Sequence, residues 1–197
     1  MPRGRSIGLF GGSFNPAHGG HLHVAKAGLR QLQLDEIWWL VSPQNPLKPE
    51  QPNWESRAAT VRSLPLPPNM RVSDVERQYG TQYTIDLLTT LKLRQAHLNF
   101  VFIMGADNLL QLPKWRDWRR IMETIPVAVI ARPSSPIKAR LGQAAQQYRY
   151  ARIAEDHAHS LKHATAPAWS YLTLPLDKRS SSAIRASTKR PAGKLDG

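Results

Sequence analysis

The clearest candidates for chemistry are two histidines three positions apart, His18 and His21, which directly follow a glycine-rich turn. An apolar segment at residues 7–10 precedes the turn, so the order predicts a strand, a turn and a helix start. Such junctions in α/β proteins bind anions, because glycines allow close approach and first-turn N–H groups point at negative charge. Side chains three apart share a helix face. We therefore predict two imidazoles beside a bound phosphate.

Alternative interpretations of this junction stay open from spacing alone. An ordinary strand-to-helix connection without a ligand has the same pattern. A metal site that includes His23 is a further alternative, but there is no cysteine in the chain and no acidic residue among residues 1–33 to complete it, so we predict no protein-bound metal. The turn fits neither the GxxxxGK loop nor the GxGxxG fingerprint, which excludes those two nucleotide-binding motifs.

The string GGSFNPAHGGHL at residues 11–22 resembles the nucleotidylyltransferase superfamily signature, G-S/T-F-D/N-P-x-H/T-x-G-H. His18 and His21 occupy its two histidine positions. The resemblance implies that both donate hydrogen bonds to the α-phosphate of a nucleoside triphosphate, and it leaves both the neutral and the protonated form open for the second. It also implies that Asn15 contacts the second substrate. The ATP-binding residues of this segment would be Gly11, Gly12, Ser13 and Phe14.

A second group of candidates follows a predicted buried strand at residues 99–104. Gly105 and Asp107 suit a ribose, since the carboxylate accepts hydroxyl donors and the glycine allows close approach; capping of a helix at residues 108–111 is the alternative role for Asp107. We expect Trp115 to present an exposed ring that stacks on a flat heteroaromatic ligand. Trp118, three positions later, is predicted to belong to the core.

Residues 102–115, FIMGADNLLQLPKW, resemble the pattern F-I-x-G-x-D-x-L-x-x-L-P-x-W of the nicotinate-nucleotide adenylyltransferases. Pantetheine-phosphate adenylyltransferases and glycerol-phosphate cytidylyltransferases share only the first signature. The resemblance implies that Trp115 stacks on the pyridine ring of nicotinate mononucleotide. Backbone amides of Thr84 and Arg116 would bind its carboxylate. Arg132, which follows a predicted strand at residues 127–131, is expected to bind phosphate.

Two further segments contribute candidate cations. Residues 43–53 carry prolines at intervals of three, and their place after a second strand predicts a loop at the ligand edge of the sheet. Lys48 in this loop would contact phosphate or stay solvated, and a polyproline ligand for another domain stays open. The family's histidine is absent here.

The string SSSAIR at residues 180–185 resembles the second superfamily signature, I-S-S-T-x-I-R. Hydroxyls at a helix start, followed one turn later by an arginine, suit an ATP triphosphate. The predicted ligands are Ser181, Ser182 and Arg185. The chain departs from the pattern at Arg179, where the family has a hydrophobic residue, and after residue 185, where no closing helix is indicated.

The remaining pattern predicts a Rossmann-like, doubly wound α/β fold with a mostly parallel sheet and helices on both faces. Residues 6–41 form a βαβ unit, with an amphipathic helix at residues 20–33 and a buried strand at residues 36–41. Helices are predicted at residues 54–64 and from an N-cap at Thr84, and strands at residues 70–75 and 168–174. Residues 133–163 are predicted to be a basic helix and loop with Tyr148 and Tyr150 on a solvated face. We expect one domain at residues 1–186 and a disordered basic tail at residues 187–197.

Composition bounds the class of protein. Lys plus Arg number 27 against 14 Asp plus Glu, a net charge of +13, and a positive field attracts nucleotides and nucleic acids alike. A nucleic-acid-binding protein is the rival class, but no RNA-binding motif is recognisable. The absence of an 18-residue apolar run, a signal peptide and cysteines favours a cytoplasmic protein without membrane partners.

The family resemblance implies adenylyl transfer from ATP to nicotinate mononucleotide, which gives nicotinate adenine dinucleotide and pyrophosphate. Such chemistry depends on positioning and charge stabilisation rather than on a protein nucleophile. Mg²⁺ would enter with the ATP phosphates. Nicotinamide mononucleotide is the alternative acceptor, and the sequence leaves a homo-oligomer possible.

Overall fold

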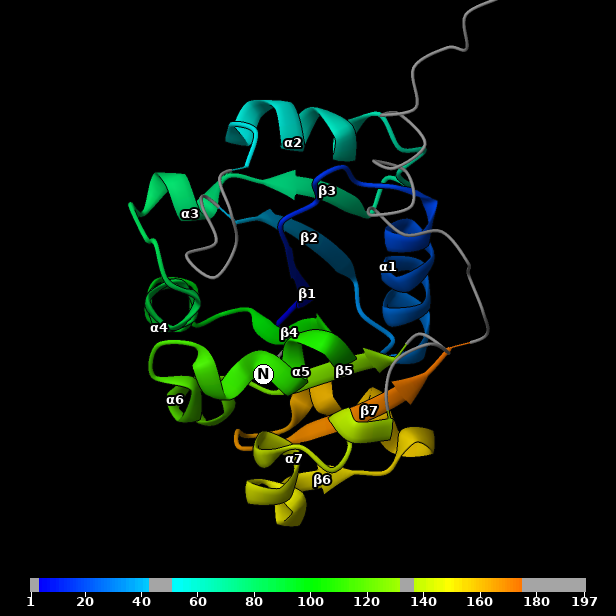
Figure 1. The fold of residues 1–197 in the computed structure, drawn as a ribbon, viewed down its shortest axis with the longest axis vertical. Helices are drawn as coiled ribbons and strands as arrows, with labels where there is room; N and C mark the ends of the chain where they lie inside the picture. Colours follow the sequence, from blue (N-terminus) through cyan, green and yellow to red (C-terminus); the bar gives the residue numbers. More distant parts are fainter. Residues whose placement is uncertain (1–3, 43–50, 132–136, 175–197) are drawn as a thin grey trace, which may run out of the picture.

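The computed structural model describes residues 4–42, 51–131 and 137–174, which form a seven-stranded parallel sheet with helices on both faces (Figure 1). The strand order is β3-β2-β1-β4-β5-β7-β6, so the chain reverses its direction of winding between β1 and β4. The strands are β1 (Ser6–Gly12), β2 (Glu36–Val41), β3 (Met70–Ser73), β4 (Asn99–Gly105), β5 (Val127–Ala131), β6 (Arg152–Ile153) and β7 (Trp169–Thr173). This confirms the predicted doubly wound fold.

The helices divide into two layers. One core cluster joins the sheet to α1, α2 and η4, and the other joins it to α4, α5, α6 and α7. Figure 1 shows α1 and α4 on opposite sides of the sheet. The helices are α1 (Gly19–Gln31), α2 (Trp54–Arg62), α3 (Val75–Gln78), α4 (Thr84–Arg94), α5 (Ala106–Gln111), α6 (Trp118–Thr124) and α7 (Gln143–Gln147), with 3-10 turns η1 (Leu112–Lys114), η2 (Ile137–Ala139), η3 (Arg149–Ala151) and η4 (Glu155–His163). None of the helices in the described residues has the length and apolar composition that a bilayer-spanning segment requires.

The central strands are apolar on both faces because both faces are covered. Trp39, Ile103 and Val129 are fully buried. Gly8 in β1 has no room for a side chain, since a Cβ there would lie 2.8 Å from methyl groups of Ile37 and Ile103. A side chain at this position would therefore require these methyl groups to shift.

Most predicted elements agree with the structure to within a few residues, and the strands at residues 36–41 and 127–131 agree at both ends. The prediction of Thr84 as an N-cap was wrong: Tyr83 occupies that position and Thr84 is the first helical residue. The helix predicted at residues 108–111 begins at Ala106, so Asp107 lies in the first turn and is not the cap. Each error is a shift of one or two residues, which sequence patterns do not resolve.

The prediction for residues 133–163 was wrong in two respects. A two-residue strand, β6, pairs with β7, and it is too short to show any alternation. Tyr148 is 2% exposed rather than solvated, and its hydroxyl donates to Oε1 of Glu123 at 2.6 Å. Burial raises the pKa of Tyr148. Tyr150 is exposed, as expected, and Trp118 belongs to the core.

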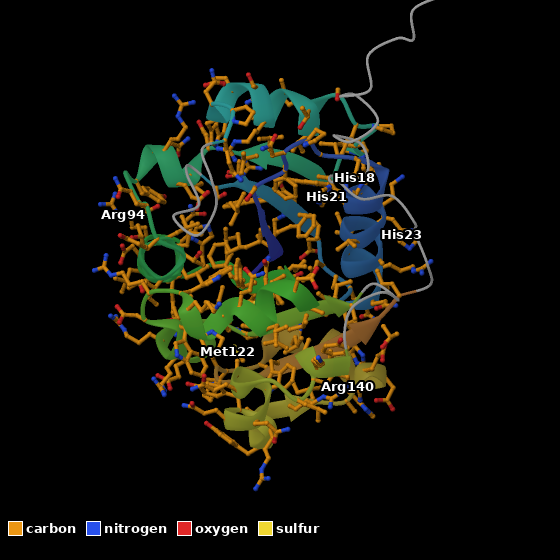
Figure 2. The ribbon with its side chains drawn as sticks, viewed as in Figure 1. His18, His21, His23, Arg94, Met122 and Arg140 are labelled. Carbon is orange, nitrogen blue, oxygen red and sulfur yellow. The ribbon has the colours of Figure 1, made fainter. Side chains whose placement is uncertain are left out.

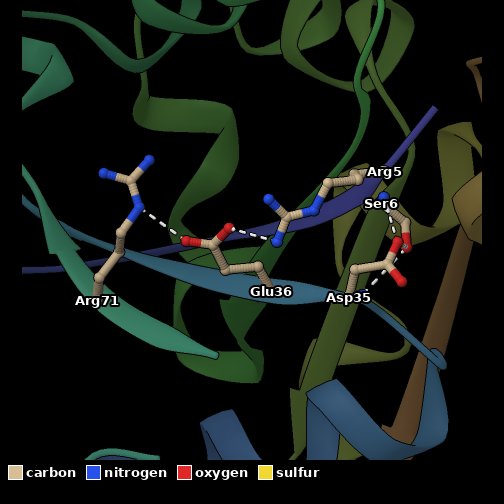
Figure 3. A network of polar contacts seen from close by, with 5 residues as sticks. All are labelled: Arg5, Ser6, Asp35, Glu36 and Arg71. Carbon is tan, nitrogen blue, oxygen red and sulfur yellow. Dashed lines mark hydrogen bonds and ion pairs between the residues drawn. The ribbon is translucent and has the colours of Figure 1, made fainter. Parts of the chain in front are cut away.

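Polar contacts join the amino ends of three neighbouring strands (Figure 3). The carboxylate of Asp35 accepts the backbone N–H and the hydroxyl of Ser6, both at 2.7 Å, and these bonds lower the pKa of Asp35. Glu36 pairs with Arg5 at 3.1 Å and with Arg71 at 2.7 Å. The network lies at the amino ends of the strands, whereas the predicted site lies at their carboxyl ends. Its role is therefore to stabilise the sheet.

Candidate active site

The carboxyl ends of β1 and β4 lie side by side where the strand order reverses. Phe10 of β1 is in register with Ile103 of β4, and the two strands end at Gly12 and Gly105. Ligands of doubly wound folds bind in the crevice at such a switch point. A Cβ on Gly105 would meet no atom within 4 Å, so the space beside its backbone is open.

His18 and His21 form a reciprocal cap at the start of α1. Nδ1 of His18 accepts the backbone N–H of Gly20 at 3.0 Å, and Nδ1 of His21 accepts the backbone N–H of His18 at 3.3 Å. The ring centroids are 4.0 Å apart. His18 is 4% exposed, whereas His21 is half-buried. The structure therefore brings the two imidazoles together and leaves His21 the more accessible.

These bonds determine which ring nitrogen can serve a ligand. An Nδ1 that accepts an N–H has a lone pair and no proton, so in each ring the proton is on Nε2. Both rings therefore present an Nε2–H donor. In this geometry the Nδ1 of His21 accepts a bond, and protonation of His21 on binding of a phosphate stays a prediction.

His23 lies apart from the pair. Two residues along a helix correspond to a rotation of about 200°, which places His23 on the face opposite His21. Figure 2 shows His18 and His21 at the N-terminal end of α1, with His23 away from them. Within the described ranges, no three histidine, cysteine or carboxylate side chains are grouped to hold a metal ion.

Phe14 connects the turn to the histidines through strained backbone. Its φ of 46° is in the left-handed region, which costs a non-glycine residue about 1–3 kcal/mol. Its buried ring packs edge-on against His21 with centroids 5.2 Å apart, and also against Phe10 and Trp39. A Cβ on Gly12 would lie 2.8 Å from this ring, so packing explains that glycine. Because the Phe14 ring is buried, a ligand at this turn would meet the backbone of Phe14 rather than its side chain.

Arg57 of α2 is a residue of the site region that sequence reasoning missed. Its side chain is 1% exposed and donates to three carbonyl oxygens, of Pro52 and Ser13 at 2.8 Å and of Ser42 at 2.7 Å. The available signal was an arginine four residues before the buried Val61, and hence on the inner face of the helix. Ser13 and Ser42 follow β1 and β2, so Arg57 links two strand ends.

The segments predicted to bind the nicotinate ring are also neighbours. Thr84 is the first residue of α4, where backbone N–H groups lack intrahelical acceptors. The guanidinium carbon of Arg116 lies 4.6 Å from the ring centroid of Tyr83, and Nη1 lies 3.8 Å from the Asp86 carboxylate. Trp115 is half-buried against the core and so keeps part of its ring accessible.

The remaining candidates are exposed, partly buried or outside the described residues. Asp107 is exposed in the first turn of α5, beside the switch point. Gly11, in β1, and Asn15, in the turn that follows it, are partly buried. Five predicted ligands lie outside the described residues; they are Lys48, Arg132, Ser181, Ser182 and Arg185.

Comparison with known proteins places the chain in a family. Residues 9–187 match the family described as cytidylyltransferase-like. A protein of Caulobacter sp. (strain K31) named "probable nicotinate-nucleotide adenylyltransferase" is 51% identical over 181 residues, which are 91% of this chain and 96% of that protein. The chain belongs to the nicotinate-nucleotide adenylyltransferase family. A Parvibaculum lavamentivorans protein of the same name is 47% identical over 184 residues, 92% of each chain.

Solved structures agree with this assignment at the level of the fold. The nicotinic acid mononucleotide adenylyltransferase of Plasmodium falciparum complexed with NaAD aligns with a TM-score of 0.68 at 19% identity, over 92% of this chain and 83% of that one. The same protein complexed with APC aligns with a TM-score of 0.66. The sequence relatives confirm the family resemblance of the two motifs, and the solved structures share the doubly wound fold.

Proposed function

We propose that the protein transfers the adenylyl group of ATP to nicotinate mononucleotide, giving nicotinate adenine dinucleotide and pyrophosphate in NAD biosynthesis. The observation that carries this proposal is the close pair of imidazoles, His18 and His21, at the start of α1 in a chain of this family. The mononucleotide phosphate attacks the α-phosphorus of ATP, a new P–O bond forms, and the bond to the β-phosphate oxygen breaks. Pyrophosphate leaves with that electron pair.

The proposed contribution of the protein is positioning and charge stabilisation. Negative charge shifts onto the α-phosphate oxygens in the transition state, where His18 and His21 donate from Nε2. No side chain acts as a nucleophile. Mg²⁺ supplies further charge neutralisation when it is bound by the phosphate oxygens of ATP.

We assign the remaining residues to the two substrates within one domain at residues 1–186. Trp115 stacks on the pyridine ring, and backbone N–H groups of Thr84 and Arg116 bind the carboxylate. Asn15, Lys48 and Arg132 contact the mononucleotide. ATP is bound by Gly11, Gly12, Ser13, Phe14, Gly105, Asp107, Ser181, Ser182 and Arg185. We place the enzyme in the cytoplasm, without membrane or specific nucleic-acid partners.

The test is pyrophosphate release by the purified protein with ATP and Mg²⁺, with nicotinate or nicotinamide mononucleotide as acceptor. We expect kcat/KM to be at least roughly tenfold higher for the nicotinate form, because a carboxylate makes charge-assisted bonds to the N–H donors and an amide does not. Equal rates, or a preference for nicotinamide, would contradict the acceptor assignment. No release with either acceptor would contradict adenylyl transfer itself.

A further inference from the structure

Arg57 holds the carboxyl ends of two adjacent strands with one buried guanidinium. Its bonds to Ser13 and Ser42 reach the residues that follow β1 and β2, and the Ser42 N–H donates to the Gly12 carbonyl at 3.0 Å. A guanidinium presents several donors in a rigid plane, which an ammonium group does not. One guanidinium group therefore donates to three backbone carbonyl groups from different segments of the chain.

A second side chain of α2 holds the same turn from its other end. The hydroxyl of Thr60 accepts the N–H of Ala17 at 2.9 Å and donates to the Arg57 carbonyl oxygen at 2.7 Å. One turn of α2 therefore contacts the chain at Ser13 and at Ala17. These contacts lie on either side of the strained Phe14 and end directly before His18.

Attachment of α2 to the sheet does not account for these bonds. Trp54 already donates from Nε1 to the Val41 carbonyl at 2.9 Å, and Ala58 and Val61 are fully buried against the second core cluster. Those contacts fix the helix on the sheet. One bond of Arg57, to Ser13, and one of Thr60, to Ala17, instead go to the connection between β1 and α1, which carries the histidines. The other Arg57 bonds reach Ser42 and Pro52.

We infer that Arg57 is a positioning residue for adenylyl transfer, which holds residues 13–17 so that His18 and His21 meet the α-phosphate in a fixed geometry. Thr60 supports it from the same helix. The inference rests on the proposed function. A displacement of about 1 Å in catalytic groups can cost roughly a hundredfold in rate, so loss of this restraint affects turnover more than substrate binding.

The test compares Arg57→Lys with Arg62→Lys on the same helix. Lysine keeps the charge but cannot reach three carbonyls in one plane, so kcat should fall at least about tenfold while KM for either substrate changes less than about threefold. Arg62 is exposed and lies 3.9 Å from Glu55, so its variant should keep wild-type kinetics. A folded Arg57→Lys protein with wild-type kcat would overturn the inference.

Thr60→Val provides a second variant in case Arg57→Lys does not fold. It removes the hydroxyl that accepts the Ala17 N–H, and we expect kcat to fall at least about threefold with unchanged KM, since one of the two restraints on residues 13–17 is lost. Wild-type kcat in this variant would likewise count against the inference.

An NMR readout separates this inference from the proposed function. In long-range ¹H–¹⁵N spectra of the wild-type protein, we expect His18 and His21 to show protonated Nε2. The Arg57 or Thr60 variant should shift these signals and leave those of His23 unchanged. Unchanged His18 and His21 signals would overturn the inference even if kcat falls. A wild-type protein without adenylyl transfer would refute the proposed function, and the spectra would still decide whether Arg57 positions the histidines.

Discussion

The backbone N–H of His18 donates to Nδ1 of His21, and the two rings stand 4.0 Å apart. The two side chains that are assigned to the α-phosphate therefore also cap α1. Capping interactions are worth about 0.5–2 kcal/mol, so variants at either position lose some stability as well as a ligand contact. Activity and unfolding must be measured together to separate the two effects.

His21→Ala should lower kcat by roughly a hundredfold to a thousandfold, because it removes a donor to the charge that develops on the α-phosphate. The melting temperature should fall only modestly, from loss of the cap. Steady-state pyrophosphate release and thermal unfolding are the measurements. His23→Ala on the opposite face of α1 is the matched control and should turn over normally. Wild-type turnover of His21→Ala would refute the phosphate role.

Trp115→Ala should raise KM for nicotinate mononucleotide several-fold more than KM for ATP, since the ring is assigned to the pyridine. Steady-state kinetics with each substrate varied in turn is the measurement. Trp118→Ala is a useful contrast, because that side chain is 6% exposed and its loss should cost about 3–5 kcal/mol of stability. Equal rises in both KM values for Trp115→Ala would indicate a core role.

Gly105→Ala should leave the free energy of unfolding nearly unchanged and raise KM for ATP several-fold. The backbone φ of −75° suits alanine, and the added Cβ would enter open space at the crevice. Gly8→Ala should do the reverse, with about 1–3 kcal/mol of destabilisation from crowding and no change in KM. Chemical denaturation and kinetics test both. An unchanged KM for ATP in Gly105→Ala would show that the ribose of ATP does not bind beside Gly105.

Glu76 should make stability depend on pH. Burial raises its pKa to about 8 from an ordinary 4.5, and Arg57 opposes this rise. Between these values the folded state keeps a proton that the unfolded state has lost, so the free energy of unfolding falls as pH rises. The slope from this group approaches about 1.4 kcal/mol per pH unit, and the loss is complete above about pH 8.

Urea unfolding at pH 5, 6.5 and 8 tests this dependence in Glu76→Gln. The variant should show a flatter profile than the wild type and greater stability at pH 8. Glu55→Gln, whose carboxylate is in an exposed side chain, should follow the wild-type profile. Parallel profiles for Glu76→Gln and the wild type would show that Glu76 is not buried in its neutral form.

The sequence by itself determined the class of fold and the position of His18 and His21 at the junction between a strand and a helix. Both depend on short-range patterns: apolar runs of strand length, a glycine-rich turn, and histidines three apart that must share a helix face. The strands β2 and β5 were predicted at both ends for this reason. Thr84 was misplaced by one residue because the backbone angles of Tyr83, rather than residue type, define where α4 starts.

Only the tertiary structure showed which side chains fix the connection between β1 and α1. Arg57 and Ser13 are 44 positions apart, and no local pattern indicates that they meet. The burial of Tyr148 and Glu76, and the Nε2 tautomers of His18 and His21, likewise depend on partners that packing brings together. The hydrogen bonds of buried polar groups depend on neighbours in three dimensions, whereas apolar periodicity can be read from the sequence alone. For this reason the sequence predicted the strands and the histidine pair, and only the tertiary structure showed the contacts that hold them.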